Sequence, residues 1–509
     1  MAKQIKFQSL RKTQIDMART LLYRSCHECY SDIFLANWTW GKTEVMRFLI
    51  FVLLVCLALF SACKAVVPEP ETSLPWTLPE RFSIEQTESN SPDSWWQSFG
   101  SDELMALIQG AMTHNFDLNT LKEKIAQAKA RVAKEQASFL PDLKFSFGGQ
   151  KKGVTVKPTA KSSSSYTGSH SLDGALNGSY TPDVWGEAKA GEQAQEMSLG
   201  AAEQDYYGYA HELRALIAET WIDIIAARSE KKILDSQIRI NQTLLELQKL
   251  RFVNGKASAL DVSQQREAFA QASSQVPLLE KQEQVLLNRL AFLCGKTSAS
   301  QVQVASVVLP EPDALPFVGI PSNLLENRPD IKAARMRLSS SQWEITAAKA
   351  DLLPSFTLTA AALFSSGQLD LLFQNWVATL GASIAGPVFD GGFRQAEVDR
   401  VKAVAREQLT LYAKTVANAI FEVENSLVGI QKQEAYIKLL EEQLVVVRLT
   451  LRDARLQYQN GQSSYLSYLI AWTSIEKLER QLVGERAAHI KERIGLFRAL
   501  GWKPTKSNG

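Results

Sequence analysis

Tyr180-Thr-Pro-Asp183-Val-Trp-Gly186 and Gly386-Pro387-Val-Phe-Asp390-Gly-Gly392 are two versions of one pattern, with their aspartates 207 residues apart (183 to 390). Each segment follows a run of residues that alternate in polarity and begins a long stretch without proline (183–276 and 388–503). Such alternation is typical of strands, and long helices rarely tolerate interior proline. We therefore predict a strand-to-helix junction at each segment.

The two junctions contain the residue types that such a turn needs. Asp183 and Asp390 are expected to cap the helices, because a carboxylate accepts hydrogen bonds from the free N–H groups of a first helical turn. Gly186, Gly391 and Gly392 are expected to permit the bend, because glycine adopts backbone conformations that other residues avoid.

Other marks occur twice as well, in the same order. Asn115-Phe-Asp117-Leu118 corresponds to Asn327-Arg-Pro-Asp330-Ile331, Phe139-Leu-Pro141 to Leu352-Leu-Pro354, and Leu250-Arg-Phe-Val-Asn254-Gly255 to Leu456-Gln-Tyr-Gln-Asn460-Gly461. The first two pairs of marks are offset by 213 residues (117 to 330 and 141 to 354) and the last pair by 206 (254 to 460). A repeat at stable spacing indicates one architectural unit used twice. We expect the two copies at 101–310 and 311–502.

Strands are predicted where apolar and polar residues alternate. Leu143, Phe145 and Phe147 mark the first strand, and the clearest strands are 356–362 and 376–385. Strands of about ten residues with one small or polar face are typical of tilted transmembrane strands. The polar segment Gly149–His170 predicts a surface loop between the first two strands.

Long helices are predicted around the strands. Helical spacing of apolar residues predicts one helix from Asp102 to about Ser138. The stretches 183–253 and 390–459 each correspond to a helix about 100 Å long at 1.5 Å per residue. Asn-Gly is a turn signal, so each long helix is expected to return as an antiparallel partner, the first at about 259–294. Pro277 lies inside that returning helix and predicts a kink there.

The fold class that follows is mainly α with a membrane β-barrel portion. Each repeat contributes a long antiparallel α-helical hairpin and a two-stranded β-hairpin. Four strands are too few for a membrane barrel, and unpaired strand edges are costly in lipid. A homotrimer with 12 strands and an α-helical tunnel resolves both difficulties.

The N-terminal region predicts export. Residues 46–62 have a positive start, an apolar stretch too short to span a bilayer and small residues at the end, which is typical of a signal peptide. Cys63 follows directly, and the site resembles a bacterial lipoprotein box, which predicts lipidation of Cys63; the alternative is an ordinary secretory signal with a chance cysteine. Residues 1–45 form an N-terminal extension, which suggests that the start codon has been assigned too far upstream. Residues 63–100 are read as a lipidated arm and 503–509 as a tail.

The motifs resemble the TolC-type outer-membrane efflux family, in particular its lipoprotein branch of multidrug and metal-export channels. The resemblance rests on Asn115-Phe-Asp-Leu, Arg328-Pro-Asp-Ile331, Leu353-Pro-Ser-Phe, Gly386-Pro-Val-Phe-Asp-Gly-Gly392, Glu422-Val-Glu424 and Asn460-Gly461. It implies a passive exit duct, anchored in outer-membrane lipid and extending into the periplasm of a Gram-negative cell. It also implies two partners, a periplasmic adaptor (membrane fusion protein) and an inner-membrane pump of the RND or ABC type.

The resemblance further implies a gate at the helix tips. Asp261 stands where the family places a gate carboxylate, and Tyr458 where it places a tyrosine that holds this carboxylate. Ser463 replaces the expected arginine, and Ser467 and Ile470 replace an acidic pair. Asp261 also has a purely structural reading as a helix cap. The tips themselves are expected to dock the adaptor through Phe252, Asn254, Gly255, Asn460 and Gly461.

Several function classes are disfavoured. With a net charge of +2 and no basic stripe, nucleic-acid binding is not expected. His211-Glu-Leu-Arg begins like a zinc-binding helix but lacks the second histidine, so no metal, cofactor or catalytic residue is predicted and the chain is not expected to be an enzyme. Two alternatives stay open: an outer-membrane channel for type I protein secretion, and a periplasmic coiled-coil lipoprotein without a pore.

Overall fold

The computed structural model describes residues 75–83, 95–156, 165–311 and 320–501, all within one unit of the chain, Val66–Gly509. The predicted extension, the signal peptide, the lipidation site Cys63 and the tail 503–509 lie outside the described residues, as does most of the arm 63–100.

The order of elements is the same in the two halves of the chain, apart from short 3-10 turns. The first half contains α3 (Asp102–His114), α4 (Phe116–Gln136), β1 (Asp142–Val156), β2 (Ser165–Tyr180), α5 (Glu187–Val253) and α6 (Ala259–Leu293). The second half contains α7 (Leu324–Asn327), α8 (Pro329–Ala350), β3 (Ser355–Ser366), β4 (Trp376–Ala385), α9 (Phe393–Gln459) and α10 (Tyr465–Leu500).

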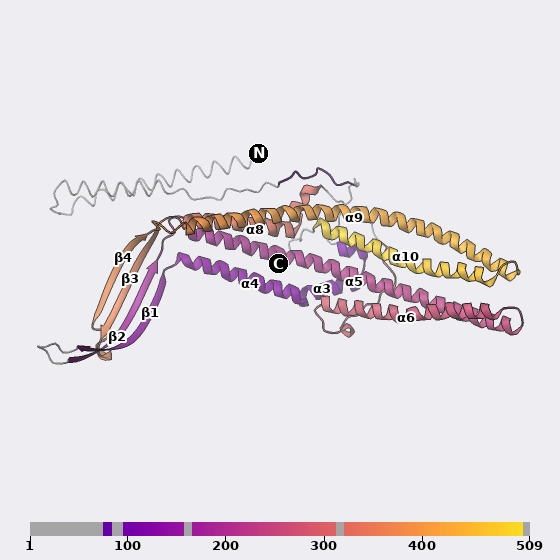
Figure 1. The fold of residues 1–509 in the computed structure, drawn as a ribbon, viewed down its shortest axis with the longest axis horizontal. Helices are drawn as coiled ribbons and strands as arrows, with labels where there is room; N and C mark the ends of the chain where they lie inside the picture. Colours follow the sequence, from indigo (N-terminus) through magenta and orange to yellow (C-terminus); the bar gives the residue numbers. More distant parts are fainter. Residues whose placement is uncertain (1–74, 84–94, 157–164, 312–319, 502–509) are drawn as a thin grey trace. The chain divides into compact units, whose positions relative to one another are not determined.

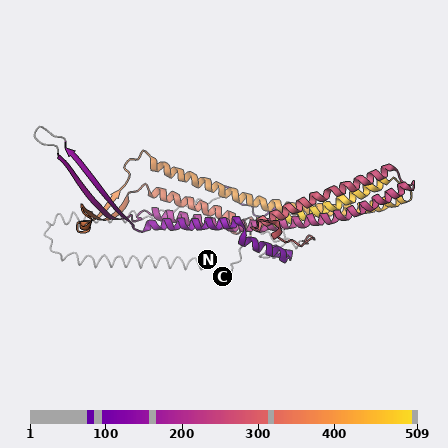
Figure 2. The same cartoon turned by 90° about the horizontal axis from the view of Figure 1, so that it is seen from below.

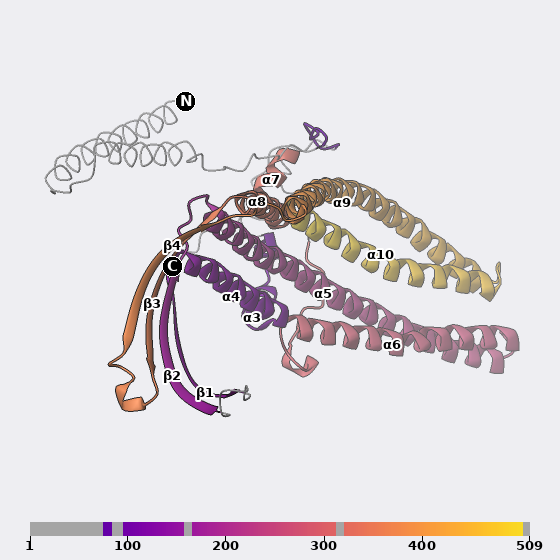
Figure 3. The same cartoon turned by 60° about the vertical axis from the view of Figure 1, so that its left-hand side comes forward.

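The described strands form one antiparallel sheet in the order β1-β2-β3-β4 (Figure 1). Each half contributes a hairpin, and β2 pairs with β3 to join them, with Leu176 opposite Ala362. Among the described strands, the outer strands β1 and β4 each have one edge without a partner. Figure 3 shows the four strands curving together away from the helices.

The register gives the sheet two different faces, because residues directly opposite one another share a face. One face is apolar, and its large side chains are exposed: Phe145 is 73% and Leu380 86% exposed. Phe145 faces Leu176 across one pair, and Leu380 faces Ala360 across another. The other face is mostly small or polar, with Thr359 and Thr379 among its residues, and the pair Leu363 and Val377 is an exception. The predicted alternation is therefore confirmed.

The predicted loop Gly149–His170 is wrong in extent. β1 continues to Val156 and β2 begins at Ser165, so only 157–164 lie between the strands. The backbone pairing continues without a gap, with Lys152 opposite Ser169. Main-chain hydrogen bonds extend a hairpin regardless of side-chain polarity, and the sequence pattern does not detect this.

The prediction of a single helix over 102–138 is also wrong, because this segment forms two helices, which are divided at Asn115. The Asn115 Oδ1 accepts a hydrogen bond from Leu118 N at 3.0 Å and so caps α4. Its Nδ2 donates to the Leu293 carbonyl at 2.9 Å, and the residue is 1% exposed. A buried asparagine with two such bonds fixes the break.

The long helices are confirmed, at 67 residues each for α5 and α9 and hence about 100 Å in length. The helix α5 packs along α4, α6, α8 and α10, and α9 packs along α8 and α10 (Figure 2). We call α5 with α6 the first hairpin and α9 with α10 the second. The helix α6 runs through Pro277 as one element. No helix in the described ranges has the length and apolar content to cross a bilayer.

The two hairpins share an apolar core at a distance from their tips. Ile217, Trp221 and Ile225 of α5 lie in one buried cluster with Ile490 and Ile494 of α10. Nearer the tips a second cluster is confined to α9 and α10. The last cluster, beside the tips, contains Tyr465 and Tyr468 with residues of all four helices.

Candidate functional site

The first strand-to-helix junction is built as the sequence predicts, with one shift in position. The N-cap of α5 is Gly186, in the left-handed region at φ 79°, and the Asp183 Oδ2 accepts a hydrogen bond from Lys189 N at 2.8 Å. The aspartate therefore caps the first turn from three residues before the N-cap. Glycine is favoured at position 186, because other residues rarely adopt this φ.

The second junction repeats this arrangement. Gly391 and Gly392 have φ of 66° and 85°. The Asp390 carboxylate accepts from Gly392 N at 2.9 Å and from Arg394 N at 3.2 Å. These N–H groups, Arg394 first, stabilise the charged form and lower the pKa of Asp390.

The junctions of the two halves also contact each other. The Trp185 Nε1 of the first junction donates to the Pro354 carbonyl at 2.6 Å, just before β3. Its ring lies 6.3 Å from that of Phe356, centre to centre. Strand and helix directions are thus fixed jointly by both repeats.

At the first tip, Asn254-Gly255 forms the turn, with Gly255 at φ 67°. Ser258 caps α6: its Oγ accepts from Asp261 N at 3.1 Å, while the Asp261 carboxylate accepts from Ser258 N at 2.8 Å. This reciprocal capping box shows the structural role of Asp261. Phe252 beside the turn is half exposed.

The second tip uses Asn460-Gly461, with Gly461 at φ 73°. The Tyr458 hydroxyl lies 3.0 Å from the donating Gln248 Nε2, so among the described residues its hydrogen-bond partner is Gln248 and not Asp261. The Ser463 hydroxyl donates to the neighbouring Ser464 carbonyl at 3.3 Å, and Ser467 lies 3.4 Å from the Ser464 hydroxyl. The structure does not bring these serines to Asp261.

Sequence reasoning missed an aromatic group behind the tips. Tyr458, Tyr465 and Tyr468 lie with ring centres 5.3 to 6.1 Å apart. The Arg251 guanidinium lies 4.8 Å above the Tyr458 ring. Burial raises the pKa of the Tyr468 hydroxyl. The spacing of Tyr465 and Tyr468 on one helical face was the signal available in the sequence.

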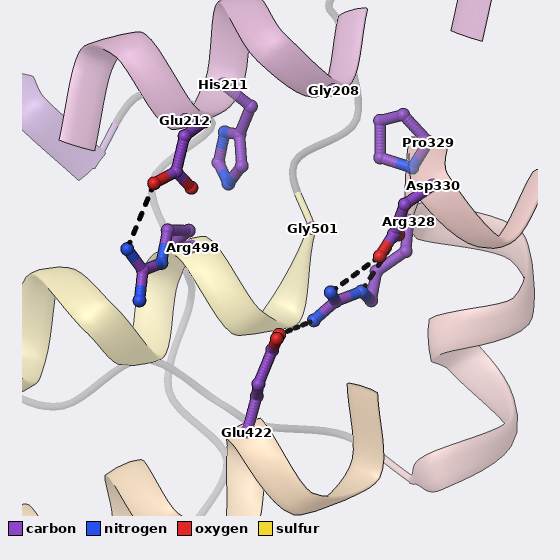
Figure 4. Close-up of a pocket in the computed structure, with 9 residues that line it drawn as sticks. All are labelled: Gly208, His211, Glu212, Arg328, Pro329, Asp330, Glu422, Arg498 and Gly501. Carbon is purple, nitrogen blue, oxygen red and sulfur yellow. Dashed lines mark hydrogen bonds and ion pairs between the residues drawn. The ribbon is translucent and has the colours of Figure 1, made fainter. Parts of the chain in front are cut away.

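A second missed group is the junction around Arg328, shown in Figure 4. The Arg328 side chain forms a two-pronged contact with Asp330 (3.0 and 2.8 Å) and donates to Glu422 at 2.6 Å and to the Ala499 carbonyl at 2.8 Å. It thereby joins the start of α8 to α9 and to the end of α10. This clamp gives the motif Arg328-Pro-Asp330 of the second repeat a structural role.

A cavity of about 420 Å³ lies beside the clamp, with His211, Glu212 and Arg498 on its wall. Arg498 and Glu212 form an ion pair at 3.2 Å, which links α10 to α5. Burial first, then the charges of Arg214 and Arg328, lower the pKa of His211 to about 4. In the described part of the chain, no group of three or more His, Cys, Asp or Glu side chains is placed to hold a metal ion.

Comparisons with known proteins agree with this geometry. The family model described as "Outer membrane efflux protein" matches residues 107–296 and 320–502. The pyoverdine export outer membrane protein OpmQ of Pseudomonas aeruginosa is 30% identical over 416 residues, covering 80% of this chain and 86% of OpmQ. The toluene efflux pump outer membrane protein TtgF of Pseudomonas putida is 30% identical over 425 residues, covering 80% of this chain and 85% of TtgF.

A solved structure has the same fold. The CmeC outer membrane channel of Campylobacter jejuni superposes with a TM-score of 0.79 at 20% identity, over 88% of this chain and 96% of that one. The family match spans both halves of the chain, including the two junctions, both tips and the Arg328 clamp. This chain therefore belongs to the outer membrane efflux protein family.

Proposed function

We propose that three copies of this chain form one passive duct, a closed 12-strand barrel in the outer membrane that continues as a helical tunnel into the periplasm. The open sheet carries this proposal. Its outer strands β1 and β4 each have one edge that pairs with no other strand of the described part of the chain, and such edges are costly in lipid. Pairing β1 of one copy with β4 of the next removes every edge.

The faces of the sheet support an orientation in the membrane. The exposed apolar face, with Phe145, Leu380 and Ile384, fits lipid. The opposite face, with Thr359 and Thr379, fits a hydrated interior. This division is typical of outer-membrane barrels.

Exposed apolar stripes on the helices support contacts between copies. On α6, Leu278, Val285 and Phe292 recur every seven residues and are 56 to 57% exposed. On α9, an exposed stripe consists of Phe421, Val428, Leu439 and Val446. A seven-residue apolar repeat is the signature of helix-to-helix packing, so the α6 stripe of one copy is assigned to the α9 stripe of the next.

As an efflux component, the duct works with an inner-membrane pump and an adaptor. We assign docking of the adaptor to the tips, through Phe252, Asn254, Gly255, Asn460 and Gly461, and lipid anchoring to Cys63. The pump is of the RND or ABC type. Relatives named for pyoverdine and for toluene are equally similar to this chain, so the cargo is assigned to the pump and not to the duct.

One substitution on each face tests the barrel. Leu380→Asp places a charge on the proposed lipid face and is expected to weaken stable insertion, because a carboxylate facing the bilayer interior costs up to about 2 kcal/mol in each of the three copies. Thr379→Asp, one residue away on the proposed interior face, is the control and is expected to insert normally. Heat-labile trimers and single-channel conductance in planar bilayers are the measurements.

Two results would contradict the proposal. If wild-type protein purified from outer membranes is monomeric and electrically silent, the duct is wrong. If Leu380→Asp and Thr379→Asp insert equally well, the assignment of the two faces is wrong.

A further inference from the structure

The contact between the two hairpins changes character along its length. Far from the tips it is apolar, between the buried isoleucines of α5 and α10. Closer to the tips it is made by polar side chains that are almost fully buried: Asn241 and Gln265 are 0%, Gln237 3% and Glu476 7% exposed. Buried polar groups at this depth are uncommon unless they are hydrogen-bonded to one another.

Glu476 of α10 stands at the centre of this polar contact. Its Oε1 accepts from Asn241 Nδ2 of α5 at 2.6 Å, and its backbone carbonyl accepts from Gln237 Nε2 at 3.1 Å. Gln237 in turn accepts from Arg480 Nη1 at 3.0 Å. One glutamate thus receives two hydrogen bonds from the first hairpin.

The network continues through α6 and returns to the second hairpin. Asn241 accepts from Gln265 Nε2, at 2.9 Å on its carbonyl and 3.0 Å on its Oδ1. Gln265 Oε1 accepts the hydroxyl of Tyr465, the first residue of α10. The path runs from α10 to α5, to α6 and back to α10, so it closes a loop across both hairpins.

This network can fix the register of the two hairpins because its contacts are directional. Apolar contacts are non-directional, so helices can slide over them at little cost. Hydrogen bonds between buried groups are directional, and each partner left unpaired is penalised. When the hairpins separate into water, however, these polar groups become hydrated, so this part of the contact opens at a lower cost than an apolar contact of the same area. The contact therefore holds one register firmly and still permits separation.

We propose that Glu476 is a positioning residue for the periplasmic entrance, which holds the second hairpin in register with the first through Asn241 and Gln265. The proposal rests on the proposed function as a duct. Eleven residues separate Glu476 from Tyr465, about 16 Å along the helix, so a shift at Glu476 is transmitted directly to the tip.

The experiment measures the leak conductance of wild-type and variant trimers reconstituted in planar bilayers without the adaptor. Glu476→Ala removes the acceptor and leaves Asn241 unpaired, and we expect the leak to rise about tenfold. Glu476→Gln keeps an acceptor oxygen for Asn241 and is expected to stay near wild type. Glu479→Ala is the matched control: Glu479 lies on the same helix but pairs with Arg448 of α9 at 3.3 Å, within the second hairpin.

The outcomes separate the two proposals. If wild-type trimers conduct and Glu476→Ala has the same leak conductance as the wild type, the positioning role is overturned and the duct is not. The positioning role is also overturned if Glu479→Ala raises the leak conductance as much as Glu476→Ala does. A silent wild type overturns the duct and this inference with it. If Glu476→Ala does not assemble, Asn241→Leu removes the donor to the same carboxylate, and wild-type leak in that variant overturns the role. Unchanged heat stability of the trimer together with raised leak supports it.

Discussion

At the scale of single residues, Asp261 has two roles to distinguish, one seen in the structure and one proposed. The capping box with Ser258 accounts for its carboxylate within one chain. In a trimer, three copies of this carboxylate near the axis would also set the charge of the entrance. We propose this gate role for Asp261, and we assign Tyr458, Ser463 and Ser467 of the second tip to the same entrance, although their hydrogen-bond partners in the described residues are Gln248 and Ser464.

Two substitutions of Asp261 separate these roles. Asp261→Ala removes both the cap and the charge and is expected to raise the leak of reconstituted trimers, at a cost of about 1 kcal/mol in the capping bond. Asp261→Asn keeps an acceptor for Ser258 N but not the charge, and is expected to weaken cation preference, because rings of carboxylates favour cations. Reversal potentials in a salt gradient measure this preference. If both variants have the leak conductance and the ion selectivity of the wild type, the gate role is wrong and Asp261 is only a helix cap.

Single residues also show what sequence reasoning can and cannot supply. The glycines at the junctions and tips were predictable, because turn chemistry is local. The partner of Tyr458 was not, because Gln248 lies 210 residues away in sequence and meets it only through the packing of α5 beside α10, the partner helix of α9. The polar network around Glu476 was missed for the same reason.

At the scale of elements, the success of prediction followed the strength of the local pattern. The strand predicted at 376–385 is β4 without change, because a lipid-facing strand alternates along its whole length. The outer parts of β1 and β2 lack this alternation, so the sequence pattern predicts a loop there. The division at Asn115 was hidden because apolar residues continue at helical spacing through it, and only the tertiary bond to Leu293 explains the cap.

The apolar stripe on α6 gives a prediction for this scale. Val285→Glu puts a charge into the proposed contact between copies, and trimers are expected to dissociate at a clearly lower temperature, because burial of an unpaired charge costs several kcal/mol. Gln284→Glu adds the same charge at the neighbouring exposed position and is the control. The fraction of trimer after graded heating in detergent is the readout. Equal dissociation temperatures would show that the stripe is not a contact between copies.

At the scale of the whole molecule, the two repeats are similar in order but joined by unlike contacts. Arg328 clamps three helices of the second repeat, while His211 and Glu212 of the first repeat complete the wall of the same cavity. Order and fold class were therefore readable from the duplicated sequence. The contacts between repeats were not, since they involve residue types that the other copy does not share: position 476, which bonds to Asn241 of the first repeat, is glutamate, whereas the position 206 residues earlier is Ala270.

His211 makes the stability of the whole fold depend on pH. Its pKa is about 4 in the folded chain, against about 6.5 in an unfolded one. Between these values the unfolded state binds more protons, so stability is retained above pH 6.5 and falls as the pH drops toward 4, by about 3 kcal/mol in total. Partly buried carboxyls such as Glu219, whose pKa is raised by burial, act in the opposite direction.

Comparison with His211→Leu isolates this contribution, because the carboxyls are common to both proteins. The difference in unfolding free energy, wild type minus variant, is expected to be constant above pH 6.5 and to decrease steadily down to pH 4. Midpoints of thermal unfolding in detergent, followed by the loss of helical circular dichroism, supply the measurement. Parallel pH profiles would mean that His211 is protonated equally in both states, and that the junction of α5, α8, α9 and α10 admits water in the folded molecule.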